Sequence, residues 1–233
     1  SLRSRFTRIS VGTKLVTVYN GVDLSGFASY KRSPHFRKRY GIGDHSLLIG
    51  SMGRIEPLKG QKYLIEACGR LKQKLQDFRL LLAGAVVDPD YFAMCKILAD
   101  RMGIGPHVIF LGHVRDACEF LNNIDIFVLP SLFEAFPRSL IEAMGAGKPV
   151  VVTNVGGCFE AVENGISGFV VPARNPSALA DTVHLLAVND KLRRKIGNAA
   201  RNRTEKMFSL RRHVKQIEQV YWELLRRNLH GSQ

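Results

Sequence analysis

Residues 126–153 read IFVLPSLFEAFPRSLIEAMGAGKPVVVT, and this stretch indicates how the chain folds. The apolar runs Ile126–Leu129 and Val150–Thr153 are short and almost continuous, as is typical of strands that are covered on both faces. Ser139–Met144 lies between them and has the residue spacing of a helix. A strand, a helix and a second strand in this order predict a parallel pair joined by a right-handed crossover.

The same alternation extends along most of the chain and predicts an α/β fold with a doubly wound parallel sheet. The expected strands are Lys14–Tyr19, Ser46–Ser51, Phe78–Ala83, His107–Leu111, Ile126–Leu129, Val150–Thr153 and Gly168–Val171. The expected helices are one that buries Leu64, Cys68, Leu71 and Leu75, and those at Tyr91–Met102, Ala117–Leu121, Ser139–Met144 and Ala178–Leu186.

Charge divides the chain into three parts. Residues 1–40 contain nine Lys and Arg against one Asp, residues 190–233 contain twelve against four acidic residues, and residues 41–189 contain thirteen against fifteen. We therefore expect a basic N-terminal segment with the first strand (1–40), a Rossmann-like ligand-binding domain (41–189) and basic C-terminal helices (190–233).

Positive charge at both ends favours an acidic partner, namely membrane phospholipid, a phosphorylated lipid or nucleic acid, although it also suits an ordinary solvated surface. Nucleic acid is the least favoured of these partners, because the sequence has no recognition-helix pattern and no basic strand pair rich in aromatic residues.

The composition is that of a globular protein, with 45% hydrophobic and 23% charged residues, and no apolar run reaches the roughly 18 residues of a bilayer-spanning helix. Cys68, Cys95, Cys118 and Cys158 lack the spacing of a metal site, so we expect small apolar thiols in a reducing compartment and no bound metal. The chain begins at Ser1 rather than at a methionine. We expect a fragment of a longer cytoplasmic protein whose basic ends can bring it to the inner face of a membrane.

The C-terminal part predicts a helix with one apolar face. Ile217, Val220, Tyr221, Leu224 and Leu225 are spaced i, i+3, i+4, i+7 and i+8, which places them on one side of a helix. We expect this face to pack either on this domain or on a part of the protein that the chain does not contain.

Glycine or polar residues follow nearly every expected strand. In open parallel sheets, ligands bind beyond the carboxyl ends of the strands, so we expect a contiguous ligand cleft there. The segments that would form it are Gly53-Arg54, Ala83-Gly84-Ala85, Gly112-His113, Ser131 to Glu134, and Asn154 to Gly157.

The segment GSMGRIEPLKG, residues 50–60, predicts a first anion site. A strand ends at Gly53, and Arg54 and Lys59 flank the start of the next helix, where the helix dipole disfavours each cation by roughly 0.3–1 kcal/mol. Free N–H groups and two cations together suit a phosphate or pyrophosphate. The alternative is that both cations simply point to solvent. The segment lacks Gly-x-Gly-x-x-Gly, which argues against a dinucleotide-dependent oxidoreductase.

A second anion site is expected where a helix begins near Pro137, a favoured first position. Arg138 and the N–H groups of Ser139 and Leu140 would then lie at the positive end of the helix dipole and face the cleft.

Glu134 and Glu142 lie on either side of this helix start. Eight residues give a separation of at most about 12 Å along a helix, which exceeds the roughly 5–9.5 Å between the paired carboxyl groups of glycoside hydrolases. Such a span suits two ends of an extended ligand with a diphosphate in its middle. The alternative for each glutamate is an ordinary solvated helix charge.

In this order, the motifs resemble those of the C-terminal half of retaining glycosyltransferases of the GT-B architecture, family 4, also known as glycosyl transferases group 1. The resemblance covers nearly everything from Tyr19 onward. The segments that carry it are Asn20-Gly21-Val22-Asp23, Gly53-Arg54 with Lys59-Gly60, the pair Glu134 and Glu142, Ala143 to Val150, Gly156-Gly157 through Glu160, Gly165, and Gly168 to Pro172.

The resemblance implies transfer of a hexose-type sugar, with retention, from a UDP- or GDP-sugar, and it implies no metal and no other cofactor. Arg54 and Lys59, beside Gly53, would bind the donor diphosphate. Glu134 would hydrogen-bond the hydroxyls of the transferred sugar, and Glu142 those of the ribose.

The remaining donor contacts implied by the resemblance come from backbone and from the base pocket. Phe136 to Leu140 would present N–H groups to phosphate and sugar, and His113 and Val114 would border the base. Pro137 departs from the glycine that is frequent at this place and removes one N–H donor, so the phosphate contact must come from later residues.

The resemblance also implies an N-terminal acceptor-binding domain that this chain lacks. We therefore expect the chain alone to be inactive or weakly active, with a saccharide or lipid-linked acceptor bound by the missing domain. The alternative function is a module that binds nucleotide sugar or anionic membrane without catalysis of its own.

Overall fold

The computed structural model describes residues 16–29, 32–75 and 77–230. Their strands form one sheet in which all neighbours are parallel, in the order β3-β2-β1-β4-β5-β6. The predicted doubly wound parallel sheet is thus confirmed, and six of the expected strands match it. These strands are β1 (Leu47–Met52), β2 (Phe78–Ala83), β3 (Val108–Gly112), β4 (Ile126–Leu129), β5 (Val150–Thr153) and β6 (Phe169–Val171).

The strand predicted at Lys14–Tyr19 is wrong for the part that can be compared. Lys14 lies outside the described residues, and positions 16–19 are not in a strand. The ring of Tyr19 instead packs edge-on against Phe208, with centroids 5.7 Å apart, and Val22 forms an isolated bridge with Ser209. Tyr19 is therefore packed on aromatic rings outside the sheet, while Val16 is 50% exposed.

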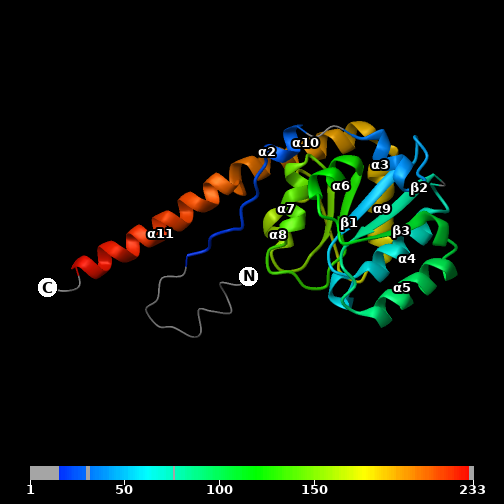
Figure 1. Ribbon diagram of the computed structural model, residues 1–233, viewed down its shortest axis with the longest axis horizontal. Helices are drawn as coiled ribbons and strands as arrows, with labels where there is room; N and C mark the ends of the chain where they lie inside the picture. The colour runs from blue at the N-terminus through cyan, green and yellow to red at the C-terminus, as the bar shows by residue number, and fades with distance from the viewer. Residues whose placement is uncertain (1–15, 30–31, 76, 231–233) are drawn as a thin grey trace.

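Helices cover both faces of the sheet and form a three-layer sandwich (Figure 1). Leu48 and Leu81 point into one apolar layer, and Ile49 and Leu80 point into the other, as alternation along a strand requires. One layer contains residues of α4 (Gln61–Leu71), α5 (Pro89–Arg101) and α9 (Pro176–Val188). The other contains residues of α2 (Ser25–Ser29), α3 (Pro34–Arg39), α6 (Ala117–Asn123), α7 (Arg138–Gly145), α8 (Cys158–Ala161) and α10 (Asp190–Met207).

The last helix, α11 (Leu210–His230), extends away from this sandwich (Figure 1). Its predicted apolar stripe exists but lies on an exposed face, with Ile217 37%, Tyr221 65% and Leu224 52% exposed. None of the helices in the described part of the chain is long and apolar enough to cross a bilayer.

The strand order reverses between β1 and β4, which are neighbours in the middle of the sheet. In open α/β sheets, ligands bind in a crevice at the carboxyl edge, beside such a reversal of strand order. The loops that border this crevice are residues 53–60 after β1, which include the 3-10 turn η1 (Pro57–Lys59), and residues 130–137 after β4. A second 3-10 turn, η2 (Gly105–His107), precedes β3.

The four cysteines are free thiols. Cys68, Cys95 and Cys158 are buried, and burial raises the pKa of Cys95 to about 11 and of Cys158 to about 12. They pack as small apolar side chains, as the sequence predicts.

Candidate functional site

The loops after β1 and β4 pack backbone against backbone. Gly60 has a φ of 67°, and a Cβ added there would lie 2.1 Å from the carbonyl oxygen of Pro130. Next to this contact, Leu132 donates its N–H to the carbonyl of Leu58 over 2.8 Å. Only glycine permits both the left-handed conformation and the close approach. The contact brings Lys59 beside Glu134.

Lys59 and Glu134 form a mostly buried ion pair at the crevice. Lys59 Nζ donates to Glu134 Oε1 over 2.7 Å, and the two side chains are 20% and 9% exposed. Ser131 Oγ donates to the same oxygen over 2.7 Å. A carboxylate held by two donors has a defined position, which a solvated carboxylate on a helix surface does not have.

The loop after β5 supports Glu134 from a third direction. Gly156 has a φ of 46°, and a Cβ there would lie 1.6 Å from the carbonyl oxygen of Glu134. Gly157 donates its N–H to the carbonyl of Ala135 over 2.9 Å. The glycine pair therefore allows three strand-end loops to meet around one carboxylate.

Arg54 is fixed at its backbone, and its side chain is mostly exposed. Its carbonyl accepts a hydrogen bond from Gln61 Nε2 over 2.7 Å, while its side chain is 62% exposed. The guanidinium Nη2 lies 2.8 Å from Glu56 Oε1, at an angle outside hydrogen-bond geometry. Gly53 is packed against the loop after β2, where a Cβ at Gly84 would lie 1.9 Å from the Gly53 carbonyl oxygen.

Helix α7 confirms the helix predicted at Ser139–Met144 and begins at Arg138, one residue before that segment and one residue after Pro137. Arg138 is its first residue, and Pro137 is the N-cap with a φ of −76°, so the structure corrects the expectation of proline at the first helical position. No side chain caps this end. The N–H groups of Arg138, Ser139 and Leu140 lie in the first turn, where they have no helical acceptor. An anion at this end would satisfy them.

Glu142 lies on α7 and is mostly buried. Its side chain is 17% exposed, and Arg138 Nη2 lies 3.5 Å from its Oε1. Burial raises the pKa of the Glu142 carboxyl, and the charge of Arg138 opposes this shift. Glu134, in contrast, lies in the irregular loop before α7, so the helical rise assumed from the sequence does not apply to this pair.

Phe136 turns its ring into the protein. The ring packs against those of Tyr19 and Phe208, with centroids 4.9 Å and 5.3 Å apart. Its carbonyl accepts a hydrogen bond from Asn20 Nδ2 over 3.2 Å. The segment before the sheet and the end of α10 thus anchor the loop that carries Glu134.

The two predicted base contacts lie at the same edge of the sheet but farther along it. They follow β3, an edge strand that is separated from β1 by β2. His113 is exposed, and Val114 is half-buried against the core. Among the described residues, neither forms a hydrogen bond or ion pair with Lys59 or Glu134.

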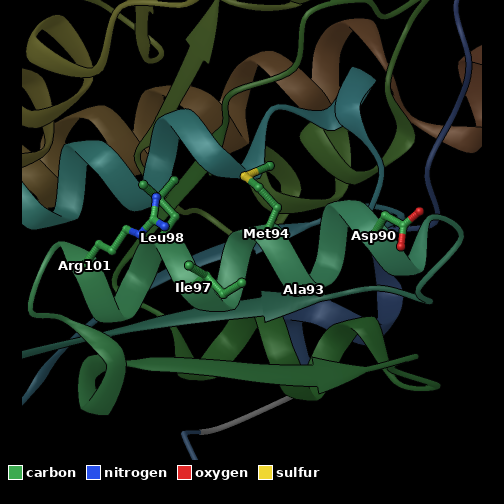
Figure 2. Close-up of a pocket in the computed structure, with 6 residues that line it drawn as sticks. All are labelled: Asp90, Ala93, Met94, Ile97, Leu98 and Arg101. Carbon is green, nitrogen blue, oxygen red and sulfur yellow. The ribbon is translucent and has the colours of Figure 1, made fainter.

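Open grooves also occur elsewhere on the surface. One runs along the outer face of α5 (Figure 2), and two others run along α11. These three grooves contain none of the predicted donor-binding residues. The first is lined by Asp90, Ala93, Met94, Ile97, Leu98 and Arg101.

Within residues 16–29, 32–75 and 77–230, no group of three or more His, Cys, Asp or Glu side chains is arranged to hold a metal ion. Arg54, Glu56, Lys59 and Glu134 lie in the two loops that follow β1 and β4, and Arg138 and Glu142 lie on α7, the helix after the second loop.

Comparison with known families decides what this arrangement belongs to. The family described as glycosyl transferases group 1 matches residues 33–203. The chain belongs to this family. The glycosyltransferase match covers β1 to β6 and therefore every strand-end loop of the crevice.

Relatives and solved structures agree with this assignment. An uncharacterized glycosyltransferase of Methanocaldococcus jannaschii, MJ1607, is 31% identical over 89% of this chain and 54% of its own. The Anabaena protein Alr3699/HepE, solved in complex with UDP and glucose, is 28% identical with a TM-score of 0.81 over 88% of this chain and 55% of its own.

The chain spans about half the length of the curated relatives that it matches. A structure of the C-terminal domain of LpcC, a group 1 glycosyltransferase of Francisella tularensis, is covered over its full length, with a TM-score of 0.73 and 24% identity over 82% of this chain. The chain therefore corresponds to the C-terminal half of a GT-B glycosyltransferase.

Ser131 and Gly157 lie in two strand-end segments of the ligand cleft that the sequence predicts, but no sequence pattern assigned Ser131 a function. The structure shows that Ser131 contacts Glu134 directly. A serine shortly after an apolar strand and three residues before a candidate glutamate is the signal that could have indicated this contact.

Proposed function

We propose that this chain is the donor-binding half of a retaining glycosyltransferase that transfers a hexose-type sugar from a UDP- or GDP-sugar. The observation that supports this proposal best is the position of the Lys59–Glu134 pair at the switch point of the sheet. The start of α7 follows the loop that carries Glu134, has no side-chain cap, and adds free N–H groups for a phosphate. UDP is the nucleotide named in the Alr3699/HepE complex.

In this proposal each group binds one part of the donor. Arg54 and Lys59 neutralise the charge that develops on the departing diphosphate, so no metal is required. Glu134 accepts hydrogen bonds from hydroxyls of the transferred sugar, and Glu142 accepts them from the ribose. The N–H groups from Phe136 to Leu140, other than at Pro137, bind phosphate and sugar. His113 and Val114 border the base.

We assign donor binding to residues 41–189. The acceptor, a saccharide or a lipid-linked sugar, would be bound by the half of the protein that relatives possess beyond the matched region. The chain alone is then inactive or weakly active, and binding rather than turnover is the property to measure.

Isothermal titration of the 233-residue chain with UDP, GDP, ADP and their sugar conjugates tests the proposal, with NAD as control. We expect one nucleotide to bind selectively, with a Kd of about 0.1–1 mM, or roughly −5.5 to −4 kcal/mol. Glu134→Ala should weaken the sugar nucleotide more than the free diphosphate. Equal binding of NAD would contradict the proposal, as would no nucleotide binding by the chain and by the full-length protein.

We also propose that the basic ends bring the full protein to an anionic membrane. Arg211, Arg212, Lys215 and Arg226 are exposed on α11, which also has an exposed apolar face, and basic amphipathic helices bind anionic bilayers. Co-sedimentation with liposomes should increase with anionic lipid and decrease with salt. If liposome binding does not change with anionic lipid content or with salt, the basic ends form an ordinary solvated surface and the membrane proposal is wrong.

A further inference from the structure

Ser131 is a fully buried polar residue directly after β4. Its hydroxyl donates to Glu134 Oε1 over 2.7 Å. Its carbonyl accepts from Thr153 Oγ1 over 2.5 Å, and Thr153, at the end of β5, is also fully buried. The neighbouring strand thus holds the serine in place, and the serine hydroxyl donates to a carboxylate. Hydrogen bonds to a charged carboxylate are stronger than those between two neutral groups.

The two oxygens of Glu134 are in different situations. Oε1 accepts from both Lys59 Nζ and Ser131 Oγ. Oε2 accepts no hydrogen bond from the residues that the structure describes, and it is not among their buried unsatisfied atoms. Two donors on Oε1 fix the orientation of the carboxylate and leave Oε2 open to a hydroxyl from outside the protein.

The two donors would respond differently to an anion in the crevice. Lys59 is a cation on a flexible stem, and a diphosphate would compete with Glu134 for its ammonium group. Ser131 is neutral and inaccessible, so an anion cannot draw its hydroxyl away. With a diphosphate bound, the Ser131 bond is the contact that continues to hold Oε1.

We propose that Ser131 is a positioning residue that holds Glu134 Oε1 so that Oε2 accepts a hydroxyl of the donor sugar. This inference rests on the proposed function of Glu134 as a sugar-binding carboxylate. It predicts that a variant without the Ser131 hydroxyl loses the extra affinity with which the protein binds a nucleotide sugar compared with the nucleoside diphosphate alone.

The test is Ser131→Ala in the 233-residue chain, titrated with UDP and UDP-glucose and, in parallel, with GDP and GDP-mannose. We expect the affinity for UDP or GDP, whichever the chain binds, to stay within about twofold of that of the unsubstituted chain. The affinity for its sugar conjugate should fall by about 3- to 10-fold, the range for loss of one hydrogen bond. Ser131→Thr, which keeps the hydroxyl, should restore much of this selectivity.

Ser167→Ala is the matched control. Ser167 is also buried, and its Oγ accepts from the Glu163 N–H over 2.9 Å, away from the crevice. It should lower stability without changing the affinity ratio of sugar conjugate to diphosphate. If Ser131→Ala weakens both ligands equally, Ser131 is only structural and the inference is overturned.

Glu134→Ala separates the two proposals. If it removes the sugar's contribution but Ser131→Ala does not, positioning by Ser131 is wrong and the function of Glu134 stands. If Glu134→Ala leaves the ratio unchanged, the proposed function of Glu134 is itself wrong. In the double variant, Ser131→Ala should add nothing to the loss, because residues that act through one another are not additive.

Discussion

Replacing Gly60 by alanine tests how the crevice is built. Gly60 joins η1 to α4, and its φ of 67° places any side chain toward the backbone of Pro130. A Cβ would lie 2.1 Å from the carbonyl oxygen and 3.0 Å from the carbonyl carbon. Backbone atoms cannot rotate away as a flexible side chain can, so one of the two loops must move.

The expected cost has two parts. The left-handed conformation disfavours alanine by about 1–2 kcal/mol, and forced displacement of packed backbone adds about 1–3 kcal/mol. Alanine also lowers the conformational entropy of the unfolded chain, which offsets about 0.4–1 kcal/mol of this loss in stability. We expect the free energy of unfolding to fall by about 1–4.6 kcal/mol, a loss that most domains survive.

Urea denaturation measures this loss, and Gly165→Ala is the control. Gly165 has a φ of 76°, but nothing lies within 4 Å of the position that a Cβ would take. It should lose only the conformational part, so the difference between the variants reports the clash. Donor affinity should fall in Gly60→Ala alone, because Lys59 moves away from Glu134. Equal stability losses in both variants would refute the close approach to Pro130.

Two further predictions concern pH. Burial raises the pKa of Glu142 above the ordinary Glu value of 4.5, and protonation removes an acceptor for the ribose hydroxyls. Nucleotide affinity should therefore fall as the pH is lowered, and the fall should begin before the pH reaches 4.5. Glu142→Gln should flatten this dependence in titrations across the pH range, and an unchanged pH profile would argue against the ribose contact. Lys148 donates to the carbonyls of Asn122 and Ile124, and burial lowers its pKa from 10.5 to about 8. Because the unfolded chain then binds more protons between these values, the unfolding free energy should rise with pH from about 8 to about 10.5, by up to about 3 kcal/mol relative to Lys148→Met; parallel pH curves for the two proteins would contradict this.

Much of the sheet could be predicted because its signals are local. A run such as Ile126–Leu129 is apolar at every position, and a short run of this kind is typical of a strand that is covered on both faces. The residues that follow each strand are then known without any structure, which is why Arg54, Lys59 and Glu134 could be selected. The segment Val16–Tyr19 shows the limit of this reasoning. Its apolar pattern suits a strand, yet Tyr19 packs on aromatic rings that lie far away in the sequence.

The amino-acid sequence by itself determined the six strands of the sheet, most of the longer helices and the loops that carry the charged side chains, since these depend on periodicity over a few neighbouring residues. The tertiary structure alone decided that Lys59 and Glu134, 75 residues apart, share a hydrogen bond. That contact requires β1 and β4 to be neighbours, and it requires Gly60 and Gly156 to let three loops approach one carboxylate. Such distances depend on strand order and on packing to within an ångström, which no local pattern encodes.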